Sequence, residues 1–325
     1  MISRRVLGGA CAAAALLSAC HRPQPPMDEH MGHMAAGDLA APSAGASMSQ
    51  GDMSLPPSAN TAPARLKESN RHAEWVKLAW EPGSKDSLMA YIVYPSTSNA
   101  KTPVVVVVHE IFGLQTWVRG VADQVAANGY IAIAPDLVSR LRGGPSADEI
   151  SGDSARKIIN GVNSVERNKG IDAAARYAMS QPSADQKYAV IGYCWGGTTV
   201  WLHAINGGVP GFSGGVAYYG LPPMDPTNPK IPAVDSVKKI TKPVMLLSGS
   251  NDARITAGMP GVDSVMKALG KHYSGTNYQG AEHGFLRAQG DPKTPPNDAM
   301  SSANVAATKD AWPKTLAFLK ANLGK

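Results

Sequence analysis

The pattern of hydrophobic and polar positions predicts a layered domain of strands and helices. Residues 88–94 alternate like a half-buried strand, whereas residues 104–108 are five consecutive valines. An uninterrupted β-branched run is typical of a central parallel strand that is covered on both faces. Residues 116–128 then carry apolar side chains near the helical spacing and stop at Gly129. This part of the chain therefore predicts a buried strand followed by a helix that packs on it.

The alternation of strand and helix continues to the end of the chain. Further strands are predicted at residues 130–134, 188–191, 215–219, 244–247 and 273–278, and further helices at residues 162–179, 195–206, 259–269 and 310–323. Repeated strand–helix units with right-handed crossovers give a mostly parallel sheet with helices on its faces. We expect one α/β domain at residues 66–325, with the last helix packed back on the sheet.

The first residues predict export and a lipid anchor. Residues 1–19 carry Arg4 and Arg5 and then about a dozen apolar or small residues, a pattern typical of a bacterial export signal. This run is shorter than the ~20 residues that a membrane-spanning helix needs. Leu-Ser-Ala-Cys at residues 17–20 resembles the lipobox of bacterial lipoproteins, in which Cys20 becomes the lipidated first residue. We expect a membrane-anchored lipoprotein on the periplasmic or cell-surface side, with the membrane and the Sec or twin-arginine export route left open.

Residues 20–65 are predicted to form a disordered tether. They are dominated by Ala, Pro, Ser, Gly and Met and contain no aromatic residue, Val or Ile. Such a segment buries too little apolar surface to offset the entropy lost on ordering. Within it, residues 27–34 combine methionines with His30 and His33, which are ligand types that suit copper. A copper site is an alternative to the simpler interpretation of this stretch as a polar linker.

The overall charge argues against nucleic acid as a partner. The formal net charge is +6, and it falls to +4 when Arg4 and Arg5 leave with the signal peptide. No run of lysine and arginine is longer than two residues. Nucleic-acid binding proteins concentrate such charge on one face or along one helix. The composition of 43% hydrophobic and 17% charged residues also excludes disorder throughout the chain.

One thiol remains for the folded domain. Of the three cysteines, Cys11 lies in the signal peptide and Cys20 is the predicted lipid attachment site, which leaves Cys194. A lone thiol in an oxidising compartment is a liability unless it is buried or used. Cys194 stands in Gly-Tyr-Cys-Trp-Gly, between a predicted strand and a predicted helix. This strand–turn–helix motif presents a nucleophile at the end of a strand, so Cys194 is the candidate nucleophile.

An acid and a base follow the nucleophile in the order that this architecture requires. Asp252 lies in the turn after the strand at residues 244–247, and His283 follows the strand at residues 273–278. The carboxyl ends of parallel strands meet at one edge of the sheet, where ligands bind. The other seven histidines lie in the tether, in predicted helices or strands, or in other loops. The sequence therefore predicts a Cys194–His283–Asp252 triad.

These motifs resemble the dienelactone hydrolase (carboxymethylenebutenolidase) family, a branch of the α/β-hydrolases with a cysteine nucleophile. The resemblance covers some 250 residues and includes Gly-Tyr-Cys-Trp-Gly-Gly around the nucleophile, His-Glu-Ile-Phe-Gly-Leu at residues 109–114 and Glu-His-Gly-Phe at residues 282–285. It implies an α/β-hydrolase fold without metal or cofactor. The lipoprotein leader is a departure from the soluble cytoplasmic enzymes of aromatic degradation that gave this family its name.

The resemblance also implies roles for individual residues. Cys194 is the nucleophile, His283 the base, Asp252 the residue that orients it, and Glu110 a carboxylate that interacts with the resting thiol. Arg287 matches a family arginine that binds a carboxylate on the substrate. A second such arginine is expected after the Pro-Asp-Leu motif, where three candidates are not separated: Arg140, Arg142 and Arg156.

The backbone N–H groups of Trp195 and Ile111 are the predicted oxyanion hole, since both loops leave the same edge of the sheet. The function expected is hydrolysis of a small lactone or ester through a thioester on Cys194. A carboxylesterase of broad specificity is the alternative within the same class. From a different class, an envelope lipoprotein that handles copper or thiols and retains an inactive hydrolase scaffold is also considered.

Overall fold

The computed structural model describes residues 51–97, 101–148, 152–289 and 299–324. The predicted signal peptide, Cys20 and the Met/His stretch at residues 27–34 lie outside the described residues. Within them no helix is long and apolar enough to cross a membrane.

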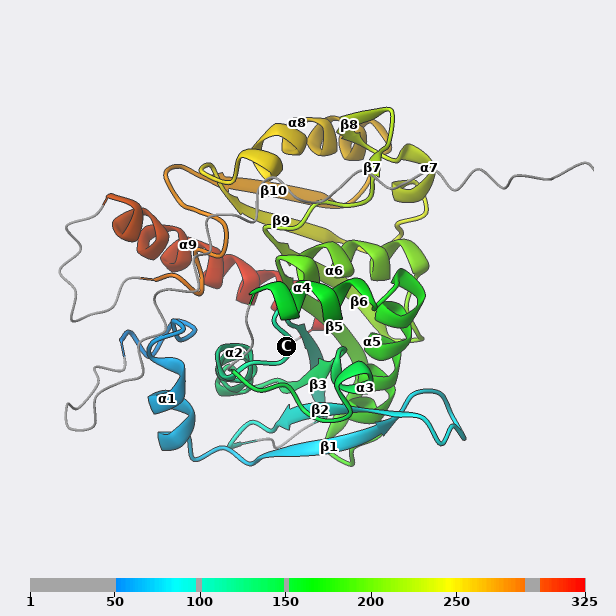
Figure 1. Cartoon of the computed structure of the whole chain (residues 1–325), viewed down its shortest axis with the longest axis vertical. Coiled ribbons are helices and arrows are strands. Elements are labelled where there is room, and N and C mark those ends of the chain that lie inside the picture. Colours follow the sequence, from blue (N-terminus) through cyan, green and yellow to red (C-terminus); the bar gives the residue numbers. More distant parts are fainter. Residues whose placement is uncertain (1–50, 98–100, 149–151, 290–298, 325) are drawn as a thin grey trace, which may run out of the picture. The chain divides into compact units, whose positions relative to one another are not determined.

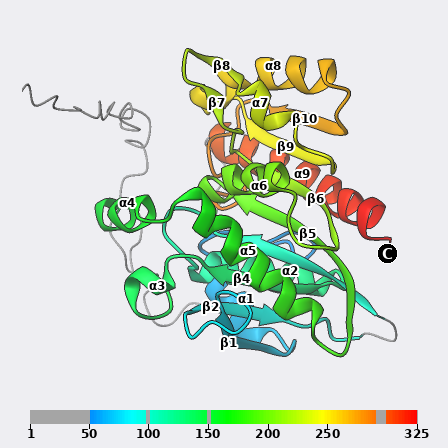
Figure 2. The same ribbon diagram turned by 90° about the vertical axis from the view of Figure 1, so that its right-hand side faces the viewer.

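An eight-stranded sheet forms the centre of the domain. Its strands stand in the order β1-β2-β4-β3-β5-β6-β9-β10 (Figures 1 and 2). They are β1 (Ala73–Ala79), β2 (Ser87–Val93), β3 (Thr102–Val108), β4 (Ile131–Asp136), β5 (Ala184–Tyr193), β6 (Phe212–Tyr218), β9 (Val244–Gly249) and β10 (Tyr273–Tyr278). β2 pairs antiparallel with both of its neighbours, and every pairing from β4 to β10 is parallel. The sheet is therefore mostly parallel, as predicted.

Helices cover both faces of this sheet. The helices are α1 (Ala62–Glu68), α2 (Thr116–Ala127), α3 (Ser139–Arg142), α4 (Gly152–Asn160), α5 (Ser164–Met179), α6 (Trp195–Asn206), α7 (Val234–Val237), α8 (Ala253–Ala268) and α9 (Ala299–Leu323). α2 and α9 pack on one face, and α5, α6 and α8 pack on the other (Figure 1). A small pair, β7 (Met224–Asp225) and β8 (Asn228–Pro232), lies beside α8.

The valine run shows why this strand is central. All five valines of β3 are fully buried. Val104, Val106 and Val108 belong to the core under α5 and α6, whereas Val105 and Val107 belong to the core under α2 and α9. Successive side chains of a strand point to opposite faces, so an unbroken apolar run satisfies both cores at once.

The predicted elements are confirmed, with the strand at residues 188–191 lying within the longer β5 and with two helices that begin earlier than predicted. The helix predicted at residues 259–269 begins earlier, at Ala253, and the helix predicted at residues 310–323 begins at Ala299. Each contains a proline, Pro260 or Pro313, which normally ends or kinks a helix. Packing of these helices on the sheet outweighs the lost backbone hydrogen bond.

The expectation of a disordered tether up to residue 65 is wrong for its last part. Leu55 is buried in the core under α2. The indole N–H of Trp117 on α2 donates to the Pro57 carbonyl at 2.9 Å, and the Gln124 amide donates to the Met53 carbonyl at 3.1 Å. The composition of the segment predicted disorder because composition does not reveal hydrogen-bond donors on a distant helix. Here α2 supplies those donors to the backbone carbonyls of the segment.

Candidate active site

Cys194 lies in the turn between β5 and α6, at the carboxyl end of a central strand. Its backbone has φ 56° and ψ −115°, and side-chain-bearing residues rarely adopt a positive φ. Backbone hydrogen bonds hold this conformation: the Cys194 N–H donates to the Tyr218 carbonyl at 3.0 Å, and the Cys194 carbonyl accepts from the Thr198 N–H at 3.1 Å. The thiol is free and partly exposed at the tip of this sharp turn.

Glycines on both sides of Cys194 allow its turn to pack against the end of β3. A Cβ atom on Gly192 would lie 2.2 Å from the carbonyl oxygen of Gly196. One on Gly196 would lie 2.5 Å from the carbonyl oxygens of both Val108 and His109. Such distances are far shorter than real contacts of a Cβ atom, so only glycine fits at these two positions. The start of α6 is therefore pressed against the segment that leads into Glu110.

His283 and Asp252 come together as predicted. Asp252 is the N-cap of α8, where its Oδ1 accepts a hydrogen bond from the Ile255 N–H at 3.2 Å. Its other oxygen, Oδ2, accepts from Nδ1–H of His283 at 2.5 Å. The carboxylate is almost fully buried. One oxygen thus anchors Asp252 to the helix, and the other fixes the orientation of the imidazole.

The charges of this group favour a protonated His283. Burial alone lowers the pKa of His283. The negative charge of Cys194 and the hydrogen bonds to Asp252 and Cys194 have the opposite and larger effect, and they raise the pKa to about 10. Burial raises the pKa of Asp252, yet the hydrogen bond and the charge of His283 hold it below its usual value. His283 is therefore hydrogen-bonded to both Asp252 and Cys194, so the three side chains form a continuous line.

Glu110 and Arg287 lie beside this line and pair with each other. Oε2 of Glu110 lies 3.1 Å from Nε of Arg287, and the Glu110 side chain is 4% exposed. Among the described residues, Oε1 of Glu110 has no hydrogen-bond partner, and the same is true of the hydroxyls of Tyr193 and Tyr219. The charge of Glu110 contributes to raising the pKa of both tyrosines above the usual value, after the larger effect of burial. Glu110 and the two tyrosine hydroxyls are therefore buried polar groups close enough to interact electrostatically.

The two predicted oxyanion donors have no backbone acceptor among the described residues. Trp195 is the first residue of α6, where backbone N–H groups have no partner within the helix. Neither the Trp195 N–H nor the Ile111 N–H donates to a backbone carbonyl in the described part of the chain. Ile111 lies in the turn after β3, against which the start of α6 packs. The structure thus brings both predicted donors to the same edge of the sheet.

The three candidates for a second carboxylate-binding arginine have other surroundings. Arg140 pairs with Asp86 at 3.1 Å and with Glu166 at 3.4 Å, and its guanidinium lies over the Trp80 ring. Arg156 pairs with Asp153 within the same helix. Arg142 lies in the short helix α3, next to Arg140 in the fold. No contact between these arginines and the line from Cys194 to Asp252 is seen in the described residues.

Two residues that sequence reasoning did not select also contact the site. His109, which we set aside as belonging to a different loop, stacks on the Trp195 ring with centroids 5.5 Å apart and planes 5° apart. Arg167 on α5 lies over the Trp195 ring at 4.1 Å. The Trp in the motif around Cys194 was the available signal, since a large aromatic side chain beside a nucleophile needs packing partners, and Trp195 is partly buried.

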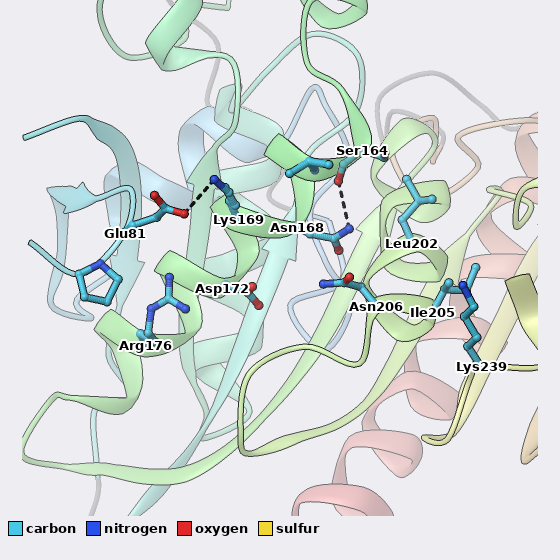
Figure 3. A pocket seen from close by; sticks show the side chains of 12 residues that line it. Glu81, Ser164, Asn168, Lys169, Asp172, Arg176, Leu202, Ile205, Asn206 and Lys239 are labelled. Atoms are coloured by element: carbon cyan, nitrogen blue, oxygen red, sulfur yellow. Dashed lines mark hydrogen bonds and ion pairs between the residues drawn. The ribbon is translucent and has the colours of Figure 1, made fainter. Parts of the chain in front are cut away.

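A groove with a cavity volume of about 890 Å³ lies elsewhere in the domain. It opens between α5, α6 and the connection from β1 to β2, and Glu81 forms an ion pair with Lys169 at its rim (Figure 3). Burial raises the pKa of Asp172 in this groove to about 6. None of the predicted site residues lines it. Within the described residues no group of three or more His, Cys, Asp or Glu side chains is arranged to hold a metal ion.

The mostly parallel sheet, with a strained cysteine turn at one strand end and an acid and a histidine at two others, defines an α/β-hydrolase. Residues 88–323 match the model of the dienelactone hydrolase family. The chain belongs to this family. The predictions of the fold class and of a hydrolase of the ester and lactone class are confirmed at the level of the family.

Individual relatives agree with this assignment. The chain is 28% identical over 249 residues to a putative carboxymethylenebutenolidase of Escherichia coli K12, which covers 75% of this chain and 86% of that protein. It is 33% identical over 178 residues to a putative carboxymethylenebutenolidase of Yersinia pestis, a match that spans 54% of this chain and 65% of that protein.

Solved structures share the fold. A putative dienelactone hydrolase from Klebsiella pneumoniae superposes with a TM-score of 0.60 at 24% identity, covering 76% of this chain and 98% of that one. The dienelactone hydrolase-like promiscuous phosphotriesterase P91 from metagenomic libraries superposes with a TM-score of 0.60 at 20% identity, covering 77% and 98%. At these identities the likeness concerns the fold alone.

Proposed function

We propose that this chain hydrolyses small lactones or esters through a covalent thioester on Cys194. The observation that carries the proposal is the hydrogen-bonded line from Cys194 through His283 to Asp252, built on a strained turn at the sheet edge. The raised pKa of His283 supports a resting ion pair of thiolate and imidazolium, in which the thiolate is the stronger nucleophile.

The first half of the reaction follows from this arrangement. The thiolate of Cys194 attacks the carbonyl carbon, and the carbonyl oxygen takes the negative charge between the N–H groups of Ile111 and Trp195. The tetrahedral intermediate then expels the alcohol oxygen, which takes the proton from His283. In a lactone the alcohol stays attached to the acyl chain, so ring opening leaves one thioester.

Water completes the cycle. Neutral His283 removes a proton from water, and the hydroxide attacks the thioester carbonyl through the same oxyanion hole. The thiolate leaves, the carboxylic acid is released, and the imidazolium and the thiolate are restored. Asp252 holds the imidazole by Nδ1 throughout, so that Nε2 faces the reacting atoms.

Arg287 is the proposed contact for a carboxylate on the substrate. In the structure Nε of Arg287 lies 3.1 Å from Oε2 of Glu110. Arg287 would therefore have to exchange the carboxylate of Glu110 for that of the substrate. The alternative, a broad carboxylesterase, is favoured by the same observation, because an arginine already paired with Glu110 needs no anionic substrate. A small neutral ester would then react with the Glu110–Arg287 pair intact.

The function is tested by a hydrolysis screen of small lactones and esters, with and without a free carboxylate, on the mature chain. Each substrate is also offered to the Cys194→Ser and Cys194→Ala variants. Trapping of an acyl group on Cys194, detected by mass spectrometry of the intact protein, would support the thioester. Turnover by Cys194→Ala at the wild-type rate would exclude it. If no substrate reacts but Cu(I) binds to the stretch at residues 27–34, the copper-handling alternative becomes the better interpretation.

Export and lipid anchoring remain part of the proposal. Support comes from the sequence of residues 1–20, ending in Leu-Ser-Ala-Cys. The precursor expressed in a bacterial host with a radiolabelled fatty acid should be labelled and should fractionate with membranes. A Cys20→Ser precursor should lose the label, and fully soluble, unlabelled wild-type protein would contradict lipidation.

A further inference from the structure

Three side chains are in contact beside the proposed oxyanion hole: Trp195, His109 and Arg167. The indole of Trp195 stacks on the imidazole of His109, with ring centroids 5.5 Å apart and planes 5° apart, and the guanidinium of Arg167 lies over the same indole, 4.1 Å from its ring centroid. The three residues come from the end of β3, the start of α6 and the start of α5. These contacts thus join three separate segments at the edge of the sheet where the proposed reaction takes place.

The hydrogen bonds of His109 fix its tautomer. Its Nε2 accepts from the Leu137 N–H at 3.1 Å, so the proton is on Nδ1, which donates to the Glu110 carbonyl at 2.6 Å. The ring is fully buried, and burial, together with the charge of Arg167, holds its pKa below the usual value. His109 is therefore a neutral, fixed donor aimed at one particular carbonyl.

That carbonyl belongs to the peptide unit that supplies one of the oxyanion donors. The peptide bond is planar and trans, so the direction of the Glu110 carbonyl sets the direction of the Ile111 N–H at the other end of the same unit. The bond from His109 also polarises this peptide and strengthens its N–H as a donor. The Gly113 N–H donates to the same carbonyl at 3.4 Å and adds to its restraint.

The other donor is the backbone N–H of Trp195, whose side chain contacts both His109 and Arg167. The Arg167 guanidinium lies over the indole, and its Nε–H donates to the Val162 carbonyl at 3.2 Å. Within the described residues Arg167 forms no ion pair with a carboxylate. Burial lowers its pKa to about 10, so the indole face and one carbonyl are the contacts that offset its desolvation.

We infer that Arg167 and His109 are positioning residues that hold the Trp195 and Ile111 N–H groups in register for the oxyanion. This inference rests on the proposed function. His109 acts through the Glu110 carbonyl and through its stack on Trp195. Arg167 acts through its contact with the indole, which limits the movement of Trp195. Neither side chain needs to touch the substrate.

The inference separates two reactions of the same thiol. Attack on an ester builds an oxyanion and needs both N–H groups, whereas alkylation by iodoacetamide displaces iodide at a saturated carbon and does not need them. Loss of alignment of about 1 Å costs on the order of a hundredfold in rate, and loss of one donor costs about a hundred- to a thousandfold. A disturbed stack should therefore slow acylation while leaving alkylation of Cys194 nearly unchanged.

The experiment uses Arg167→Met, which keeps the length of the side chain but removes the planar cation from the indole. Acylation is measured by stopped-flow with 4-nitrophenyl butyrate and alkylation with iodoacetamide at the same pH. Acylation is expected to fall about ten- to a hundredfold, with alkylation within about threefold of wild type. Arg176→Met on the same helix is the matched control, because Arg176 lines the distant groove (Figure 3). It should match wild type in both reactions.

A second variant guards against a folding defect. His109→Asn retains an N–H donor near the position of Nδ1, whereas His109→Phe retains an aromatic ring but no donor. Acylation should be faster in His109→Asn than in His109→Phe when both are folded by circular dichroism. Equal loss of acylation and alkylation in Arg167→Met, or acylation equal to wild type, would overturn the inference. If wild-type protein is alkylated but no ester acylates it, the proposed function itself fails.

Discussion

Gly196 offers a direct test of how closely the nucleophile turn packs against β3. In Gly196→Ala the new methyl group would lie 2.5 Å from the carbonyl oxygens of Val108 and His109. Both oxygens belong to backbone at the end of a fully buried strand, so they cannot move aside as the tip of a flexible side chain would. The start of α6 must shift away from β3 by several tenths of an ångström or more.

Forcing a methyl group into such a packed region typically costs about 1–3 kcal/mol of unfolding free energy. For a domain of this size that corresponds to a fall in Tm of roughly 2–4 °C per kcal/mol. The shift would also separate the N–H groups of Trp195 and Ile111, since these residues begin α6 and follow β3. A misalignment of about 1 Å costs on the order of a hundredfold in rate. Activity should therefore fall much more than stability.

The assay compares Gly196→Ala with Gly144→Ala by urea unfolding and by ester hydrolysis at 25 °C. A Cβ atom on Gly144 would meet nothing within 4 Å, so this variant should stay within about 0.5 kcal/mol of wild type and keep its activity. If Gly196→Ala is as stable and as active as Gly144→Ala, the close approach of the two segments and the reasoning built on it are refuted.

Cys194→Ala should abolish turnover with little loss of Tm. It should also lower the pKa of His283 from its raised value of about 10, because the thiolate charge is removed. An NMR titration of the imidazole that shows the same pKa in both proteins would contradict the proposed ion pair. Asp252→Asn should lower kcat by at least about a hundredfold, because an amide no longer orients and stabilises the imidazolium, and steady-state kinetics near wild type would exclude the role of Asp252. Arg287→Ala should lower kcat/KM about ten- to a hundredfold for carboxylate-bearing lactones, since a charge-assisted hydrogen bond contributes about 1.5–3 kcal/mol, but only a few-fold for a neutral ester of the same size. Equal losses on both substrates would favour the broad carboxylesterase.

Local chemistry in the sequence was enough to predict the α/β fold and the residues of the proposed triad. Five consecutive valines have no stable place except between two covered faces, so the central strand could be predicted without knowing its neighbours. The motif around Cys194 carries its own geometry, because glycines at fixed offsets allow a turn that other residues would block. Parallel strands place their carboxyl ends at one edge, and this brought Asp252 and His283 into the prediction.

The edge strand β1 and the ordered end of the tether were not predicted, because the local sequence gives only a weak signal for either of them. β1 exposes Glu74 and Lys77 on an outer strand, so its apolar signal is weak. Leu55 and the carbonyls of Met53 and Pro57 are held by α2, more than fifty residues away in the chain. Contacts of this kind depend on where a distant helix lies, which local composition does not reveal.

The sequence by itself determined which groups supply the proposed chemistry: a single domain thiol, a histidine and two carboxylates at strand ends. Only the tertiary structure decided their partners. It paired Arg287 with Glu110, and it placed both His109 and Arg167 against the ring of Trp195. Hydrogen bonding within a turn follows from neighbouring residues, whereas the partner of a long charged side chain depends on which of several segments converge at the sheet edge.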